Sequence, residues 1–140
     1  MVNLKNENID IAITCSNFVK TRYFFEKILG LDVVMEFKVD KSAANNLGLA
    51  PVGFTQTRFV LGDTKIKLLE FDSAEVNSAN HHSGISQGVR WITLYVNDIS
   101  ETYEILKSKG YEFLGDVPIK PKGALVLKGP EGILIEFIGS

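Results

Sequence analysis

The chain has 140 residues, of which 45% are hydrophobic and 23% charged, and its formal net charge is −2. This length is enough for one domain with a substantial core, and the composition is that of an ordinary globular protein. The pI of about 5.7 and the lack of a Lys/Arg cluster among aromatic residues argue against nucleic acid as a partner.

No apolar run approaches the roughly 20 residues that a membrane-spanning helix needs, so we expect no membrane partner. The polar start MVNLKNEN lacks the apolar core of a secretory signal. The single Cys15 excludes an intrachain disulfide and is compatible with a reducing compartment. We therefore expect a cytoplasmic protein.

The first predicted elements are a strand, a capped helix and a glycine stop. Residues 9–15 alternate in the manner of a half-buried strand, and Asp10 lies on its more polar face, which can line a cavity. Ser16 or Asn17 can cap the helix that follows. Gly30 stands where that helix is expected to end.

Three more strands complete the first half. Residues 31–39 predict the second strand, and residues 40–53 are loop-like with a short helical turn. Residues 54–61 and 65–71 predict a hairpin across the turn Gly62-Asp63-Thr64, in which glycine supplies an unusual backbone conformation.

The second half repeats this plan after a polar linker rich in Ser, Asn and Gly at residues 72–87. A strand at 90–96 leads to a helix at 99–109 that Asn97 or Asp98 caps and Gly110 ends. The remaining strand candidates are residues 112–114, 124–128 and 133–138.

Each half is therefore expected to be a βαβββ module, with the first at about 8–71 and the second at about 88–138. An offset of 81 residues maps Asp10 onto Trp91 and Asn17 onto Asp98. This internal repeat predicts an α+β fold in a single domain.

The sequence resembles the vicinal-oxygen-chelate superfamily, which includes glyoxalase I, bleomycin-resistance proteins and extradiol dioxygenases. The matching stretches are IAITCSNFVKTRYFFEKILGLDVV, RFVLGDTKIKLLEF, ITLYVNDISETYEILKSKGYEF and LKGPEGILIEF, which together span nearly the whole chain. The resemblance implies two βαβββ modules that form a curved, eight-stranded mixed sheet around a cup. It also implies a homodimer, which would cover sheet edges and the open face.

Enzymes of the superfamily usually bind a divalent metal through four strand positions that hold His or Gln, Glu, His and Glu. In this sequence those positions fall on Asp10, Lys67, Trp91 and Glu136. A protonated lysine cannot ligate a metal, and the indole N–H of tryptophan only donates. We therefore expect no metal and no other cofactor.

The same register predicts that Lys67 lies between Asp10 and Glu136 and keeps both carboxylates ionised. One interpretation is an ion pair left after loss of the metal. The other is a functional site, in which Asp10 or Glu136 acts as a general base or the three groups orient a polar substrate. Glu70 is disfavoured in place of Lys67, because it points to the opposite face of its strand.

Four further residues are candidates for substrate binding. Trp91, Thr93 and Tyr95 share the face on which Asp10 lies in the first module, and they suit a flat or partly apolar ligand. Arg58 can bind a carboxylate or phosphate bidentately. The alternatives are core packing for the first three and a surface position for Arg58.

His81 and His82 are the only histidines, and they lie in the polar linker. One interpretation is a solvated loop. The other is that one of them closes over the cup as a metal ligand or acid–base group.

Three functions follow from these residues. The first is a metal-independent isomerase, lyase or cyclase that uses Asp10, Lys67 and Glu136 on a small organic substrate. The second is a non-catalytic protein that sequesters a drug or metabolite. The third is a divalent-metal enzyme with atypical ligands: Asp10, Glu136 and a linker histidine.

Overall fold

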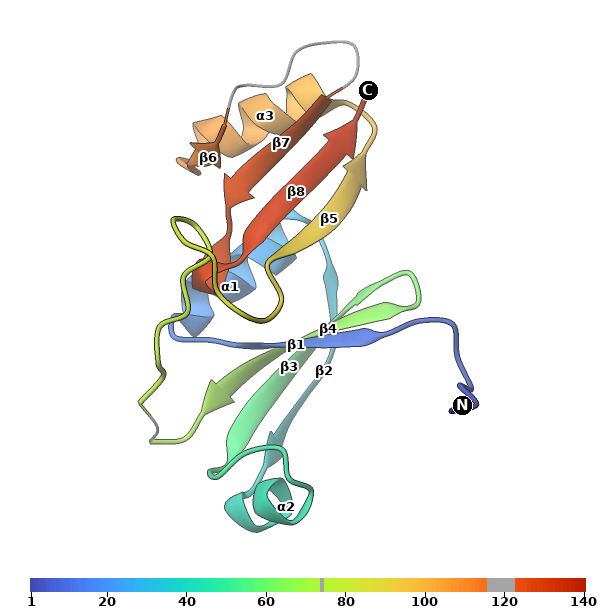
Figure 1. Ribbon diagram of the computed structural model, residues 1–140, viewed down its shortest axis with the longest axis vertical. Coiled ribbons are helices and arrows are strands. Elements are labelled where there is room, and N and C mark those ends of the chain that lie inside the picture. Colours follow the sequence, from blue (N-terminus) through green and yellow to red (C-terminus); the bar gives the residue numbers. More distant parts are fainter. Residues whose placement is uncertain (74, 116–122) are drawn as a thin grey trace. The chain divides into compact units, whose positions relative to one another are not determined.

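A computed structural model of the chain describes residues 1–73, 75–115 and 123–140 (Figure 1). Residue 74, within the expected linker, lies outside the described residues. The chain divides into two compact units, Met1–Asn77 (unit 1) and Ser78–Ser140 (unit 2), and each is described by itself. No helix in the described ranges is long and apolar enough to cross a membrane.

Unit 1 is a four-stranded mixed sheet with short helices. Its elements are β1 (Asp10–Thr14), α1 (Phe18–Tyr23), the π-helical turn η1 (Phe24–Ile28), β2 (Asp32–Val39), α2 (Lys41–Asn46), β3 (Phe54–Leu61) and β4 (Thr64–Phe71). The strand order is β1-β4-β3-β2, in which β1 runs parallel to β4 and the other pairs are antiparallel.

Unit 2 repeats this topology. Its elements are β5 (Trp91–Val96), α3 (Ile99–Ser108), β6 (Phe113–Leu114), β7 (Gly123–Lys128), the 3-10 turn η2 (Pro130–Gly132) and β8 (Leu134–Gly139). The order β5-β8-β7-β6 is the same permutation, again with the first strand parallel to the last. The predicted βαβββ repeat and α+β fold are confirmed, with the eight strands in two four-stranded sheets.

One face of each sheet is buried by the helix of its own unit. In unit 1 the Phe25 ring lies 6.0 Å from Phe59 of β3 and 5.3 Å from Phe24, and all three side chains are fully buried. In unit 2 the buried side chains Ile99 and Leu106 lie on α3, the helix that contacts β7 and β8. The face opposite the helix is here called the open face of each unit, and it carries the predicted site residues.

The structure selects between the expected helix caps. Asn17 accepts a hydrogen bond from the Lys20 N–H at 3.2 Å, and Asp98 accepts one from the Glu101 N–H at 2.9 Å. The first helix departs from the expected regular form, because the Leu29 N–H bonds the Phe24 carbonyl five residues back in a π turn.

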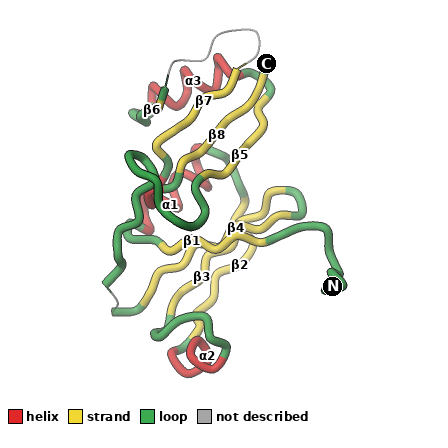
Figure 2. The backbone as a smooth tube through the Cα atoms, in the orientation of Figure 1, coloured by secondary structure: helices red, strands yellow, loops and turns green. Residues whose placement is uncertain are grey.

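The loop that precedes β5 is held against the turn that precedes β8. Figure 2 shows the long loop between β4 and β5 without helix or strand in its described part. The His81 N–H donates to the Gly132 carbonyl at 2.9 Å. Gly132 has φ +77°, and a Cβ added there would lie 1.9 Å from the Ala79 carbonyl oxygen. Glycine is therefore required at this contact.

Replacing Gly132 with alanine should destabilise the protein more than the same change at Gly110. Both glycines have positive φ, but a Cβ at Gly110 meets nothing within 4 Å. The left-handed conformation alone should cost about 1–2 kcal/mol, and Gly132→Ala adds the backbone clash. Urea unfolding measures both variants. Equal free energies of unfolding for the two variants would contradict the packing of this loop.

Candidate functional site

The strand registers put the four expected cup positions at matching places in the two units. Those positions are Asp10, Lys67, Trp91 and Glu136. Lys67 lies beside Ala12 in the β1–β4 pair, and Glu136 lies beside Thr93 in the β5–β8 pair. The offset of 81 residues between β1 and β5 makes these two pairs equivalent. Glu70 pairs with Thr55 of β3 and lies on the face of β4 opposite to Lys67, as expected.

Unit 1 joins two of the predicted residues in an ion pair. The Lys67 Nζ lies 3.3 Å from the Asp10 Oδ2, and the two side chains are 24% and 32% exposed. Burial tends to raise the pKa of the Asp10 carboxyl, but the hydrogen bond and charge of Lys67, with the charge of Lys65, hold it below its ordinary value. Lys67 and Lys65 therefore favour the ionised form of the Asp10 carboxyl.

These residues do not fit the divalent metal that the resemblance implies. The Lys67 ammonium occupies the approach to the Asp10 carboxylate, and the Trp91 indole has no lone pair to give. Over the described residues, neither unit brings together three or more His, Cys, Asp or Glu side chains that could hold a metal. No step of the function is therefore derived through a metal.

Arg58 lies on the open face of unit 1, directly across from Lys67 in the β3–β4 pair. Its Nη2 donates to the Gln56 Oε1 at 2.9 Å, and its guanidinium carbon lies 5.6 Å from the centre of the Phe37 ring. Arg58 is thus a half-buried residue held by neutral groups, which differs from the surface position that sequence reasoning left open.

The open face of unit 2 combines a hydrogen-bonded carboxylate with aromatic side chains. The Thr93 hydroxyl donates to the Glu136 Oε1 at 2.8 Å. Trp91 and Tyr95 lie two residues to either side of Thr93 and are 53% and 80% exposed. Core packing is therefore wrong for these two aromatic residues.

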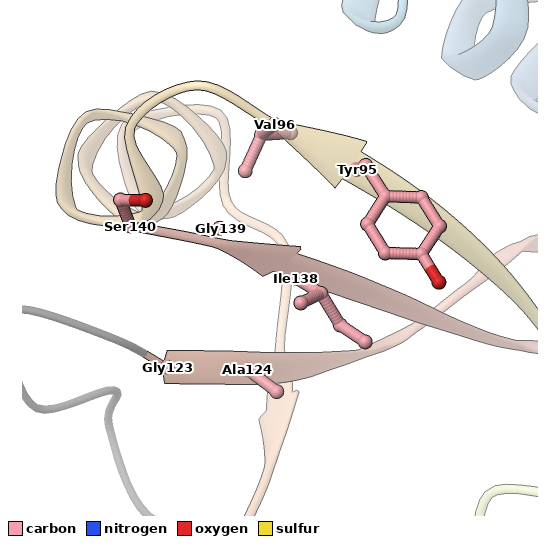
Figure 3. A pocket seen from close by; sticks show the side chains of 7 residues that line it. All are labelled: Tyr95, Val96, Gly123, Ala124, Ile138, Gly139 and Ser140. Atoms are coloured by element: carbon pink, nitrogen blue, oxygen red, sulfur yellow. The ribbon is translucent and has the colours of Figure 1, made fainter.

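A hollow of about 590 Å³ lies at the Tyr95 end of this face. Figure 3 shows Tyr95, Ile138 and Ala124 projecting from the neighbouring strands β5, β8 and β7. Because Ile138 follows Glu136 by two residues, both side chains lie on the same face of β8. The hollow therefore lies on the strand face that also carries Glu136, and Ile138 and Ala124 give it an apolar surface.

The two histidines are held against the η2 turn within unit 2. The His82 Nε2 lies 3.0 Å from the Gly129 carbonyl oxygen and 3.2 Å from that of Ile133. His81 is only 5% exposed. The expectation of a solvated loop is wrong for His81, because the contact at Gly132 draws this segment onto the turn.

The structure groups the predicted residues within each unit. Asp10, Lys67 and Arg58 share the open face of unit 1, and Trp91, Thr93, Tyr95 and Glu136 share that of unit 2. Sequence reasoning missed Phe37 and Ile138. The two-residue spacing from Glu136 could have identified Ile138. Phe37 carried no such signal, because the β2–β3 register shifts between Val33 and Met35.

Replacing Lys67 with methionine should raise the pKa of Asp10. A lowered pKa means that the ion pair stabilises the fold above the ordinary carboxyl pKa of about 4, and that this stabilisation is lost as the pH falls through the folded value. Carboxyl carbon NMR titration measures the shift. Lys38→Met is the matched control, because Lys38 pairs with Asp72 instead. An unchanged Asp10 pKa in the Lys67 variant would contradict the pairing.

The sequence matches the model of a known protein family. Residues 10–137 match the model of the Glyoxalase/Bleomycin resistance protein/Dioxygenase superfamily. No protein with a curated description matches the sequence.

Several solved structures share the fold. A glyoxalase family protein from Bacillus cereus is similar with a TM-score of 0.80 and 24% identity, over 99% of this chain and 97% of that one. A glyoxalase/dioxygenase from Nostoc punctiforme has a TM-score of 0.65 and 14% identity, over 94% and 88%. An antibiotic-binding protein from Streptomyces sp. CB03234 has a TM-score of 0.63 and 13% identity, over 98% of each chain. The chain belongs to the glyoxalase/bleomycin-resistance/dioxygenase superfamily.

Proposed function

We propose that this protein binds a small organic molecule on the open face of unit 2 without a metal, and sequesters it unchanged. The observation that carries the proposal is the exposure of Trp91 and Tyr95 on either side of the Thr93–Glu136 hydrogen bond. Aromatic walls with a few fixed polar groups are typical of ligand sites, whose volumes run from about 300 to 1,000 Å³. The hollow beside Tyr95, at about 590 Å³, lies in that range.

Binding without catalysis is favoured by the chemistry of Asp10. Its carboxylate is already paired with the Lys67 ammonium, so a substrate proton would have to compete with that cation for it. The antibiotic-binding protein from Streptomyces supports the same choice, since it joins this fold to ligand capture. The homodimer and the cytoplasmic location expected from the sequence are part of the proposal. A monomer by light scattering would contradict the former.

The second candidate is a metal-independent isomerase, lyase or cyclase, and Glu136 is the observation that favours it. This carboxylate lies half-buried on the open face and is oriented by the Thr93 hydroxyl. A general base needs such positioning within reach of a substrate proton. In this alternative Trp91 and Tyr95 hold the substrate against Glu136.

The binding proposal is tested through Trp91, the single tryptophan of the chain. Titration with the neutral aromatic probe N-phenylnaphthylamine should change the Trp91 fluorescence in a saturable way. Tyr95→Ala should weaken the binding by roughly two- to tenfold, since an aromatic pair contributes about 0.5–1.5 kcal/mol beyond its buried area. Tyr23→Ala is the matched control, because Tyr23 is an exposed tyrosine on α1. The absence of a saturable change, or equal affinities in both variants, would contradict the proposal.

The two candidates are separated by the fate of a bound compound. Compounds that bind are incubated with the protein and recovered for mass spectrometry, and sequestration predicts that they return unchanged. A new product would favour the enzyme, and its formation should then fall at least about 100-fold in Glu136→Gln, the range of a general base. If Glu136→Gln and Asp10→Asn each turned the compound over at the wild-type rate, neither carboxylate would be the base.

A further inference from the structure

The open face of unit 1 carries more positive than negative charge near its centre. Arg58, Lys65 and Lys67 share this face with two carboxylates, those of Asp10 and of Asp32 at the start of the edge strand β2. Asp10 forms its ion pair with Lys67. Arg58 and Lys67 lie directly opposite each other on neighbouring antiparallel strands, an arrangement that destabilises a sheet when the charges are alike. An anion placed between the two cations would remove that repulsion.

The groups that hold the Arg58 guanidinium are neutral. The Gln56 amide oxygen and the Phe37 ring fix the guanidinium from two sides. Within the described ranges, no carboxylate lies close enough to form an ion pair with it, and its buried Nε–H has no hydrogen-bond partner. An unmet buried donor is unfavourable by about 1–3 kcal/mol. A small rotation of the guanidinium on binding would let Nε–H and Nη–H donate together to one oxyanion.

The surroundings of Arg58 favour an organic anion over a simple inorganic one. Met35 pairs with Arg58 across β2 and β3 and is 49% exposed. Together with the Phe37 ring it supplies an apolar surface next to the cation. A planar or apolar body can lie on this surface while its charged group meets the guanidinium.

We propose that the open face of unit 1 is a binding site for an organic oxyanion, a carboxylate or phosphate on an aromatic body, with Arg58 as the residue that selects the charge. Lys67 adds to the positive field, and Asp10 holds Lys67 in place. The inference concerns unit 1 alone and does not depend on the function proposed for unit 2.

The test follows the Arg58 Nε–H resonance by NMR in the wild-type chain. The probes are benzoate, its neutral counterpart benzamide, phenyl phosphate and inorganic phosphate. Benzoate should shift the resonance in a saturable way and bind at least about tenfold more tightly than benzamide, as charge-assisted bidentate pairs do. Phenyl phosphate should bind more tightly than inorganic phosphate. The tighter of benzoate and phenyl phosphate identifies the oxyanion.

Variants assign the effect to Arg58. Affinities are measured by isothermal titration calorimetry. Arg58→Gln should abolish the tighter binding of benzoate relative to benzamide. Arg58→Lys should retain part of this difference, because lysine keeps the charge without the bidentate geometry. Lys38→Gln removes one positive charge from the opposite face of β2 and should leave the preference intact.

Three results would overturn the inference. Equal affinity for benzoate and benzamide would remove the selection of charge. Equal affinity for phenyl phosphate and inorganic phosphate would remove the apolar surface. If no probe shifted the Arg58 Nε–H resonance in a saturable way, the proposed site would not exist. The Trp91 fluorescence of the same samples reports on unit 2 separately, so failure here is distinguishable from failure of the proposed function.

Discussion

The parallel pairing of the first strand of each unit with its last strand is the constraint on which the rest of the structure depends. Parallel neighbours need a crossover, and the helix that follows the first strand packs on one face of the sheet. The opposite face carries the predicted site residues of that unit. The register of that pairing then decides what the open face presents, with Lys67 beside Ala12 in unit 1 and Glu136 beside Thr93 in unit 2.

The two open faces share a backbone plan but differ in chemistry. In unit 1 the Lys67–Asp10 ion pair lies beside Arg58, whose partners are neutral. In unit 2 the Thr93–Glu136 hydrogen bond lies between exposed aromatic rings. Where metal-binding relatives would place donors, this chain has an ammonium and an indole. The proposed recognition of an organic molecule by charge and aromatic contact would use these groups directly, whereas metal coordination would have to displace them.

Local patterns were enough to predict most of the fold and part of the site. The alternation in β1, the caps and the offset of 81 residues predicted the repeat, and the resemblance to the superfamily predicted Lys67 near Asp10. The rest depends on contacts that sequence spacing does not carry. A register shift in β2 brings Phe37 under Arg58. The burial of His81 follows from the close approach of Ala79 to Gly132, two segments far apart in the chain.

We propose that this member of the superfamily recognises its ligand without a divalent metal. Calorimetric titration of tag-free protein with Mn²⁺, Ni²⁺ and Zn²⁺ tests it most directly. The account predicts no stoichiometric binding of any of these ions, because Lys67 neutralises Asp10 and Trp91 offers no lone pair. Stoichiometric binding with micromolar affinity that is lost in both Asp10→Asn and Glu136→Gln would contradict it.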